Sequence, residues 1–170
     1  MRRVMVIGCS GAGKSTLARH LAKTLELPLI GLDSVYWRPG WIETSMLEFR
    51  DAVARLVDGP AWIMDGNFDS TFDLRMPVAD TIVWLDLARW ACVRGVLTRL
   101  VREYGRTRVD LPDGCPECFD LEFLMYVWNF NAAHRPRIVA ALEKFAGQAQ
   151  LHRLKSRMDA ERFMATIERR

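Results

Sequence analysis

Residues 8–15 read GCSGAGKS and decide how this sequence folds. They match the phosphate-binding pattern G-x-x-x-x-G-K-[ST] at every fixed position. The apolar run Arg3–Ile7 precedes them and predicts a buried strand. The run Lys14–Glu26 follows, with leucines at helical spacing on one face. Strand, glycine-rich turn and amphipathic helix together are the context in which this pattern binds phosphate.

The residue types in this turn suit an anion. Glycines let the backbone turn tightly and bring its N–H groups around a phosphate, and the start of the following helix adds a positive dipole end. Lys14 supplies a mobile charge for the β and γ phosphates, and the Ser15 hydroxyl is a predicted Mg²⁺ ligand. The alternative is a glycine-rich turn with a chance Lys-Ser pair. The predicted nucleotide-binding residues of this turn are Gly8, Ser10, Gly11, Ala12, Gly13, Lys14, Ser15 and Thr16.

Length and composition favour an ordinary globular protein. The chain has 170 residues, of which 50% are hydrophobic and 26% charged, so we expect a single domain over residues 1–170. We find no apolar run of about 18 residues that would span a membrane, and the run behind Met1 is too short for a secretory signal. The four cysteines do not form a secreted disulfide framework at this length, so we expect a cytoplasmic protein. The net charge of +3 is compatible with small anionic substrates and does not require nucleic acid.

Apolar strand patterns alternate with helical patterns along the whole chain. Short apolar strands joined by helical crossovers lie parallel in one sheet that is covered on both faces, which predicts a three-layer α/β fold. Functional residues are then expected at the carboxyl ends of the strands. The predicted strands cover residues 3–7, 28–32, 61–64, 81–85 and 150–154, and the predicted helices cover 14–26, 45–57, 88–104, 119–145 with a break near Pro136, and 159–169. Ser45 and Glu48 form a capping box that begins the second of these helices. The third is expected to turn its apolar residues inward, which are Val93, Val96, Leu97, Leu100 and Val101.

Acidic residues follow three of these strands. Asp65 ends the apolar run Trp62–Met64, as the acid of a Walker B strand does, and is the preferred ligand of a magnesium-bound water. Asp33 follows the second strand and is the preferred group for a substrate hydroxyl, as base or as orienting acceptor. The alternative for each is a helix N-cap or a turn residue, and Asp86 fits that role best because a helix is predicted just after it.

Arginines gather on the helix after the fourth strand. Arg99, Arg102 and Arg106 share one helical face if the helix continues through Gly105. Arginines on a closing lid stabilise the charge of a transferring phosphoryl group, and the polar excursion Gly105–Cys118 is a candidate lid. The alternatives are a solvated basic face and a nucleic-acid patch.

Cysteines and tryptophans leave their roles open. Cys115 and Cys118 form one C-x-x-C pair, which leaves a zinc site, a redox pair and two free thiols as alternatives. Trp37 and Trp41 flank Pro39-Gly40 and either stack on a substrate ring or pack the loop. The core is expected to hold Trp62, Trp84 and Trp90.

With these motifs in place, the chain resembles the P-loop kinases of the adenylate kinase and shikimate kinase group. More closely, it resembles the adenylate-kinase-related proteins known as DNA topology modulation proteins. That resemblance covers nearly the whole chain and rests on residues 8–16, 32–33, 37–41, 62–67, 85–86 and 155–156.

The resemblance implies the P-loop NTPase fold, with a five-stranded parallel sheet in the order 2-3-1-4-5 and a helical lid at about residues 105–135. It also implies ATP on residues 11–16, with the adenine near Ser156 and Arg157. Asp65 matches the acid of the Asp-Gly-Phe-Pro-Arg motif of adenylate kinases, but residues 65–69 read DGNFD and lack the arginine that would grip a monophosphate. Arg75 is the candidate replacement.

The sequence therefore predicts an ATP-dependent phosphotransferase that uses Mg²⁺ and an unidentified small-molecule or nucleotide acceptor. Lys14, Asp33, Arg99 and Arg102 are the predicted catalytic residues, and Ser15 and Asp65 the predicted metal site. The residues predicted to contact the acceptor are Asp33, Trp37, Asp65, Asn67 and Arg75. The alternative function is an ATP-binding or ATP-hydrolysing regulator of DNA topology with no small-molecule acceptor.

Overall fold

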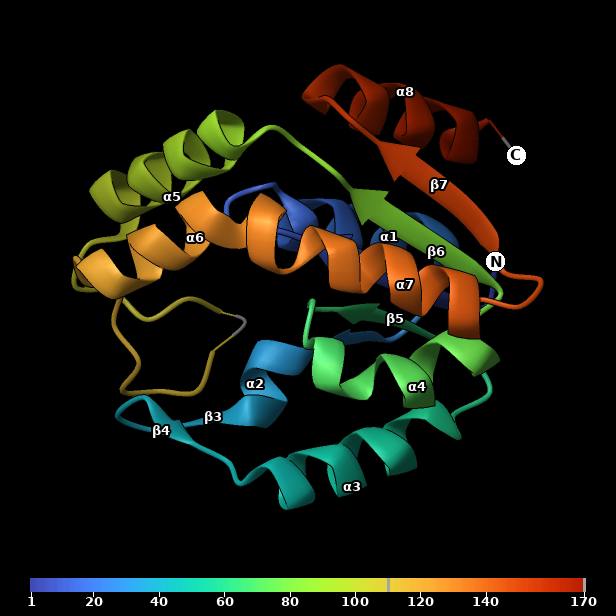
Figure 1. Ribbon diagram of the computed structural model, residues 1–170, viewed down its shortest axis with the longest axis horizontal. Coiled ribbons are helices and arrows are strands. Elements are labelled where there is room, and N and C mark those ends of the chain that lie inside the picture. Colours follow the sequence, from blue (N-terminus) through green and yellow to red (C-terminus); the bar gives the residue numbers. More distant parts are fainter. Residues whose placement is uncertain (110, 170) are drawn as a thin grey trace.

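A parallel β-sheet lies at the centre of the computed structural model, which describes residues 1–109 and 111–169 (Figure 1). In this part of the chain five strands form the sheet in the order β2-β5-β1-β6-β7. Taken in chain order along the sheet, this is the predicted order 2-3-1-4-5, so the predicted fold class is confirmed. The strands are β1 (Arg3–Gly8), β2 (Leu29–Gly31), β5 (Trp62–Asp65), β6 (Thr81–Leu85) and β7 (Gln150–Leu154).

Burial explains why these segments form strands. Val4–Ile7 of β1 are fully buried, and β5 and β6 are buried along their whole length. Central strands covered on both faces are continuously apolar rather than alternating, as these are. The strand register brings functional positions to one edge, because Asp65 of β5 lies beside Gly31 of β2 and Val6 of β1, and Gly8 lies beside Leu85.

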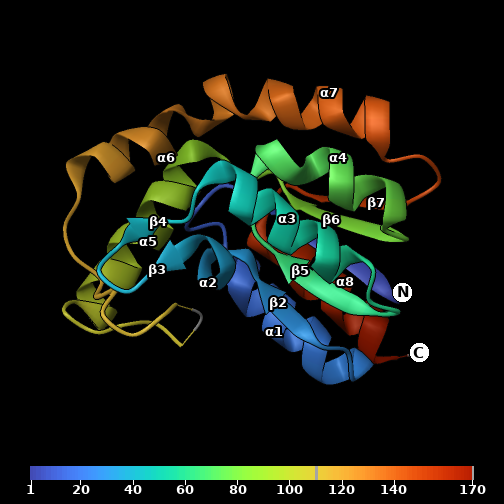
Figure 2. The same ribbon diagram turned by 90° about the horizontal axis from the view of Figure 1, so that it is seen from below.

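Helices cover both faces of the sheet (Figure 2). On one face lie α1 and α8, and on the other lie α4 and α7 together with α3, which packs against α4. Beyond the carboxyl ends of the strands lie α5 and α6 (Figure 1). The bounds are α1 (Lys14–Leu25), α3 (Met46–Val57), α4 (Phe72–Arg75), α5 (Arg89–Glu103), α6 (Leu121–Ala133), α7 (Arg135–Phe145) and α8 (Arg157–Glu168).

Two segments meet beyond the same edge. After β2 comes the short helix α2 (Leu32–Tyr36) and a small hairpin of β3 (Trp37–Arg38) and β4 (Ile42–Glu43). In the connection from α5 to α6, residues 104–109 and 111–120 are irregular apart from two isolated bridges. The hairpin and this connection are bonded to each other, since the N–H of Gly40 donates to the carbonyl of Gly114 at 3.0 Å and the indole of Trp41 donates to the carbonyl of Pro116 at 3.2 Å.

Several local predictions are confirmed. Ser45 caps α3 and accepts from the N–H of Glu48 at 3.3 Å, as the capping-box pattern indicates. The predicted break near Pro136 occurs at His134, where α6 ends and α7 begins. In the described residues, no helix combines the length and apolar character needed to cross a membrane.

Other predictions are wrong. The side chain of Trp90 was expected in the core but is 68% exposed, and Leu97 and Val101, expected to face inward, are also exposed. The reason is that α5 buries a narrow face that includes Cys92 and Val96. Residues 69–78 form α4 and two short 3₁₀ turns, which the sequence patterns did not predict.

Candidate active site

The phosphate loop leads from β1 into the start of α1. Its conformation needs glycine, because Gly8, Gly11 and Gly13 have φ of 139°, 78° and 97°. The first turn of α1 has no side-chain cap and no acidic residue, so its N–H groups are available to an anion. The ammonium of Lys14 lies over the loop and donates to the carbonyl of Cys9 at 3.0 Å. The loop therefore has the geometry of a phosphate cradle.

A second helix fixes the position of this loop. A Cβ on Gly11 would overlap the carbonyl oxygen of Cys92, and a Cβ on Gly95 would overlap the carbonyl oxygen of Gly11. The loop and α5 thus pack backbone against backbone through two facing glycines. This contact places the arginines of α5 close to the phosphate loop.

Cys9 and Cys92 meet at the same contact, and both thiols are buried. The hydrogen bond with Cys92, together with burial, raises the pKa of Cys9 above its usual range. The same hydrogen bond lowers the pKa of Cys92.

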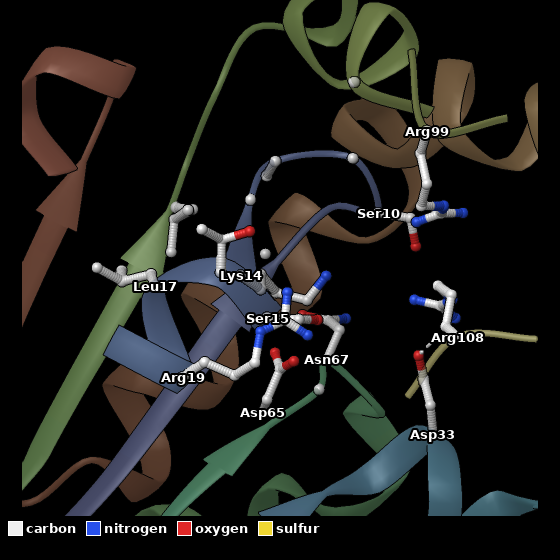
Figure 3. A pocket seen from close by; sticks show the side chains of 18 of the residues that line it. Ser10, Lys14, Ser15, Leu17, Arg19, Asp33, Asp65, Asn67, Arg99 and Arg108 are labelled. Atoms are coloured by element: carbon white, nitrogen blue, oxygen red, sulfur yellow. Dashed lines mark ion pairs between the residues drawn. The ribbon is translucent and has the colours of Figure 1, made fainter. Parts of the chain in front are cut away.

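Two oxygen donors for a metal ion line the cleft in front of the loop. Ser15 belongs to the first turn of α1 and Asp65 ends β5, and both point toward the same space as Lys14 (Figure 3). A hydroxyl and one carboxylate suit Mg²⁺, which binds through few protein oxygens plus phosphates and water. Within the described residues no group of three or more His, Cys, Asp or Glu side chains could hold a metal ion. The donor set therefore fits a magnesium nucleotide better than a metal held by the protein alone.

An ion-pair chain crosses the cleft opposite the phosphate loop. Arg99 of α5 pairs with Glu117 at 3.1 Å, and Glu117 pairs with Arg108 at 2.8 Å. Arg108 in turn reaches Asp33 of α2 at 3.6 Å (Figure 3). The Glu117 side chain is only 8% exposed. We call these four residues the arginine–carboxylate chain. It joins the connection between α5 and α6 to the helix after β2.

The remaining cleft residues come from several elements. Arg102 of α5 and Arg157 of α8 line the cleft, and in the described part of the chain neither makes an ion pair within 4.0 Å. Ser156 caps α8 and accepts from the N–H of Asp159 at 3.1 Å. The C-terminal helix thus supplies one wall of the cleft, at the place predicted for the adenine.

The hairpin supplies an aromatic wall. Trp37 and Trp41 both line the cleft, with their rings edge to face at 5.3 Å. Trp37 also packs edge to face on Tyr36 at 5.0 Å. The two alternatives predicted for these tryptophans are therefore compatible, because each ring packs within the hairpin and also borders the cleft.

The structure places Arg75 elsewhere, which corrects its predicted contact with the acceptor. Its side chain is fully buried and does not line the cleft. It donates to Thr71 Oγ1 at 2.9 Å and to the carbonyls of Gly66 at 3.0 Å, Asn67 at 2.6 Å and Phe68 at 3.1 Å. Burial lowers its pKa to about 9. Arg75 thus holds the loop after β5 in place and has no nitrogen directed at a ligand.

The expectation that Asp86 caps a helix is also wrong. Ala88 occupies the N-cap of α5, and the Asp86 side chain is 8% exposed and pairs with Arg135 at 3.0 Å and with Arg153. Both guanidiniums also lie over the ring of Trp84. This carboxylate therefore ties β6, β7 and α7 together.

The C-x-x-C pair shows two different environments. Cys115 is buried and donates to the carbonyl of Arg38 at 3.3 Å, whereas Cys118 is exposed. The two are free thiols. Cys115 thus adds a third contact between the hairpin and the α5–α6 connection.

One cleft brings together every predicted site residue except Arg75. Sequence reasoning missed other lining residues, among them Arg19, Glu117, Tyr126 and the pair Asp69–His134. Glu117 lies between the two cysteines of the C-x-x-C pair, in a segment without periodicity, so no pattern marked it. The predicted residues that line the cleft are Gly8, Ser10, Gly11, Ala12, Gly13, Lys14, Ser15, Thr16, Asp33, Trp37, Asp65, Asn67, Arg99, Arg102, Ser156 and Arg157.

Comparison with known proteins identifies the fold. No protein-family model and no curated protein matches the chain. Among solved structures, it is similar to shikimate kinase from Acinetobacter baumannii in complex with shikimate, with 16% identity, a TM-score of 0.58, and coverage of 98% of this chain and 90% of that one. It is also similar to a sugar kinase from Janibacter sp., with 17% identity, a TM-score of 0.55, and coverage of 98% and 91%. Deoxyadenosine kinase from M. mycoides with products dCMP and dCDP bound is a third, with 11% identity, a TM-score of 0.54, and coverage of 98% and 96%.

These likenesses show the fold of the chain. The chain has the P-loop fold of the adenylate and shikimate kinase group, and the likeness extends over nearly its whole length. At such low identity it establishes the fold alone. The closer resemblance to DNA topology modulation proteins stays a prediction.

Proposed function

We propose that this protein is an ATP-dependent phosphotransferase that uses Mg²⁺ and a small-molecule acceptor. One observation carries the proposal: the phosphate loop, the acid at the end of β5 and the arginines of α5 all line one cleft. Phosphoryl transfer needs little covalent chemistry from the protein, because positioning and electrostatic stabilisation supply most of the rate enhancement. The elements that such stabilisation requires are those that line this cleft.

Each residue then has a role. Backbone N–H groups of residues 11–16 bind the nucleotide phosphates, and Lys14 turns from the carbonyl of Cys9 to the β and γ phosphates. Ser15 and Asp65 would hold Mg²⁺, directly or through water, and that ion would neutralise charge on the phosphate oxygens. Arg99 and Arg102 stabilise the charge that spreads over the transferring group.

Asp33 orients the acceptor or takes its proton. It lies in the first turn of α2, at the sheet edge next to Asp65, and its side chain is 39% exposed. A carboxylate there accepts a hydrogen bond from a hydroxyl and directs the oxygen toward the γ phosphate. The connection between α5 and α6, with the start of α6, is the proposed lid that excludes water during transfer.

The first test is ADP formation with Mg²⁺ and ATP in the presence of a panel of nucleosides, monophosphates, sugars and hydroxy acids. We expect ADP formation to depend on one compound of the panel. Lys14→Ala should lower kcat by about 100-fold or more, because it removes charge stabilisation of the transition state. Lys23→Ala, at an exposed position of the same helix, is the matched control and should retain full activity.

Two outcomes would contradict the proposal. One is ADP formation that no compound of the panel increases, which would indicate an ATPase. The other is unchanged turnover in Lys14→Ala with the wild-type circular dichroism spectrum. Both variants should melt within a few degrees of the wild type, since substitutions at partly exposed surface positions change stability little.

A further inference from the structure

We propose that the acceptor is an uncharged ring compound with hydroxyl groups, a nucleoside or a sugar, rather than a monophosphate or a carboxylate. This inference rests on the proposed kinase function and concerns the acceptor half of the same cleft. Three observations carry it: the charge balance of the arginine–carboxylate chain, the burial of Arg75, and the aromatic wall next to Asp33.

The arginine–carboxylate chain has no net charge. It joins two guanidiniums, Arg99 and Arg108, to two carboxylates, Glu117 and Asp33, over distances of 3.1, 2.8 and 3.6 Å. Glu117 and Arg108 are 8% and 14% exposed, so water screens this chain little. An anionic group placed against it would meet two carboxylates as well as two guanidiniums. This wall therefore offers an anion no surplus of positive charge.

The loop after β5 offers an anionic acceptor no free positive charge from Arg75. Arg75 is its candidate cation, but every guanidinium nitrogen donates to Thr71 or to a carbonyl of residues 66–68. To reach a ligand, the fully buried side chain would have to break these four hydrogen bonds. Buried donors and acceptors without partners cost free energy, so Arg75 is expected to keep its present hydrogen bonds and not to turn toward a ligand.

Several arginines that line the cleft have no carboxylate partner within 4.0 Å among the described residues. One of them, Arg106, lies in the same α5–α6 connection as Glu117 and Arg108, and we assign it to the nucleotide phosphates. In the described part of the chain, Arg94 and Arg102 of α5 and Arg157 of α8 line the cleft and make no ion pair within 4.0 Å. α5 packs on the phosphate loop through Gly95, so we assign Arg94 and Arg102 to the nucleotide half, whereas Arg99 of the same helix is paired with Glu117. The positive charge of the cleft thus serves the triphosphate.

What the acceptor half does offer suits hydroxyls and rings. Asp33 and Glu43 are carboxylates that line the cleft and can accept hydrogen bonds from hydroxyl groups. Trp37 and Trp41 border the same space, and the bond of Trp41 to Pro116 fixes its ring. Sugar and base rings pack favourably on such fixed aromatic surfaces.

The test measures acceptor binding without nucleotide, by calorimetry and tryptophan fluorescence, on matched pairs of compounds. The pairs are thymidine with thymidine 5′-monophosphate, ribose with ribose 5-phosphate, and shikimate methyl ester with shikimate. Pyrimidine nucleosides avoid competition for the adenine site. All titrations are repeated with Lys14→Ala, so that a phosphate bound to the phosphate loop is recognised by its loss. We expect at least one uncharged compound to bind Lys14→Ala about tenfold or more tightly than its charged counterpart.

A specificity variant makes the test sharper. Glu117→Gln removes one negative charge from the arginine–carboxylate chain and leaves a guanidinium uncompensated. The ratio of affinities, uncharged over charged, should fall by about tenfold, because the charged compound gains an attraction. Glu122→Gln, at an exposed position in the first turn of α6, is the matched control and should leave the ratio unchanged. Thermal melting of both variants checks that the fold is retained.

The inference is overturned if the charged member of every pair binds Lys14→Ala as tightly as its uncharged partner or more tightly, or if no uncharged ring compound binds. An unchanged affinity ratio in a folded Glu117→Gln variant also overturns it. Failure of the kinase proposal is recognised separately, since ATP binding and ADP formation are measured in their own assays. An uncharged compound that binds but is never phosphorylated would keep the binding inference and end the kinase proposal.

Discussion

Two facing glycines fix the position of the phosphate loop, and this makes a prediction at the scale of single residues. In helix α5, Gly95→Ala would by helix propensity alone raise stability by about 1 kcal/mol. We expect the opposite, because the new Cβ would overlap the carbonyl of Gly11. The displaced loop should lower ATP affinity by about tenfold or more, and overpacking should cost about 1–3 kcal/mol.

Thermal melting and an ATP titration check this prediction. Leu97→Ala, two positions along the same helix and 42% exposed, is the control and should affect neither measurement strongly. A Gly95→Ala variant that is more stable than the wild type and binds ATP normally would contradict the packing described for α5.

Arg75 gives a second prediction at this scale. Arg75→Leu would remove four hydrogen bonds. The Phe68 carbonyl would still accept from Thr71, but the Thr71 hydroxyl and the carbonyls of Gly66 and Asn67 would lose this donor, and a buried polar group without a partner costs roughly 1–3 kcal/mol. We expect a loss of about 3 kcal/mol or more in the free energy of unfolding, measured by urea denaturation. Arg137→Leu, whose side chain is 66% exposed in the wild type, should lose far less. An Arg75→Leu variant that is as stable as the wild type but binds the acceptor less tightly would contradict this structural role and would support a contact between Arg75 and the acceptor.

At the scale of elements, the proposed function makes the connection between α5 and α6 a lid, so its accessibility should change when nucleotide binds. Arg106 is exposed in this connection and lines the cleft, so trypsin should cleave there in the free protein. Mg²⁺ with ATP should slow this cleavage several-fold, because the arginine would contact phosphate. Mass spectrometry of the fragments identifies the site.

Lys14→Ala is the control for this experiment, since nucleotide should give it no protection. Equal cleavage rates with and without nucleotide, in wild-type protein known to have ATP bound, would contradict the assignment of a lid to this segment.

Helix α5 illustrates what sequence patterns can and cannot predict. Its bounds and its place after β6 follow from the sequence, but the predicted inward face was wrong at Leu97 and Val101. Large apolar residues normally mark the buried face of a helix. Here Gly95, together with Cys92 and Val96, turns to the phosphate loop, because the close approach excludes larger side chains. The spacing of large apolar side chains predicts the face of a helix that packs through side chains, but it does not predict a contact between two backbones.

The candidate site divides in the same way. The residues of the phosphate loop and the acids at strand ends follow from a motif and a topology, so the sequence predicts them. Glu117 and the true role of Arg75 depend on contacts between segments far apart in the chain. Such contacts are set by the whole fold, and no local pattern encodes them.

At the scale of the whole molecule, Asp80 gives a pH-dependent prediction. Its carboxylate accepts from the N–H groups of Arg2 and Arg3 at 2.6 and 2.9 Å, and thereby ties the start of β1 to the segment before β6. Burial by itself would raise the pKa of Asp80. The hydrogen bonds from the Thr81 hydroxyl and from these N–H groups act in the opposite direction and outweigh burial, so the pKa of Asp80 is lowered. A lowered folded-state pKa means stability that is present above the unfolded value of about 3.9 and is lost as pH falls below it.

The comparison of Asp80→Asn with the wild type checks this. The variant should melt at a lower temperature at pH 7, and the difference should shrink as the pH falls from about 4 toward 2. Asp51→Asn, at an exposed position of α3, is the control and should follow the wild type at every pH. A difference that grows with acidity would contradict the hydrogen bonds assigned to Asp80.

The hydrogen bonds between the hairpin and the α5–α6 connection have a kinetic consequence. Gly40 and Trp41 are bonded to Gly114 and Pro116, and Trp41 borders the cleft where an acceptor would lie. If a product leaves past the hairpin, these hydrogen bonds, which we call the clasp, must break before it can depart. The residence time of the product would then follow the opening rate of the clasp, so a weakened clasp would speed turnover even though it touches no reacting atom.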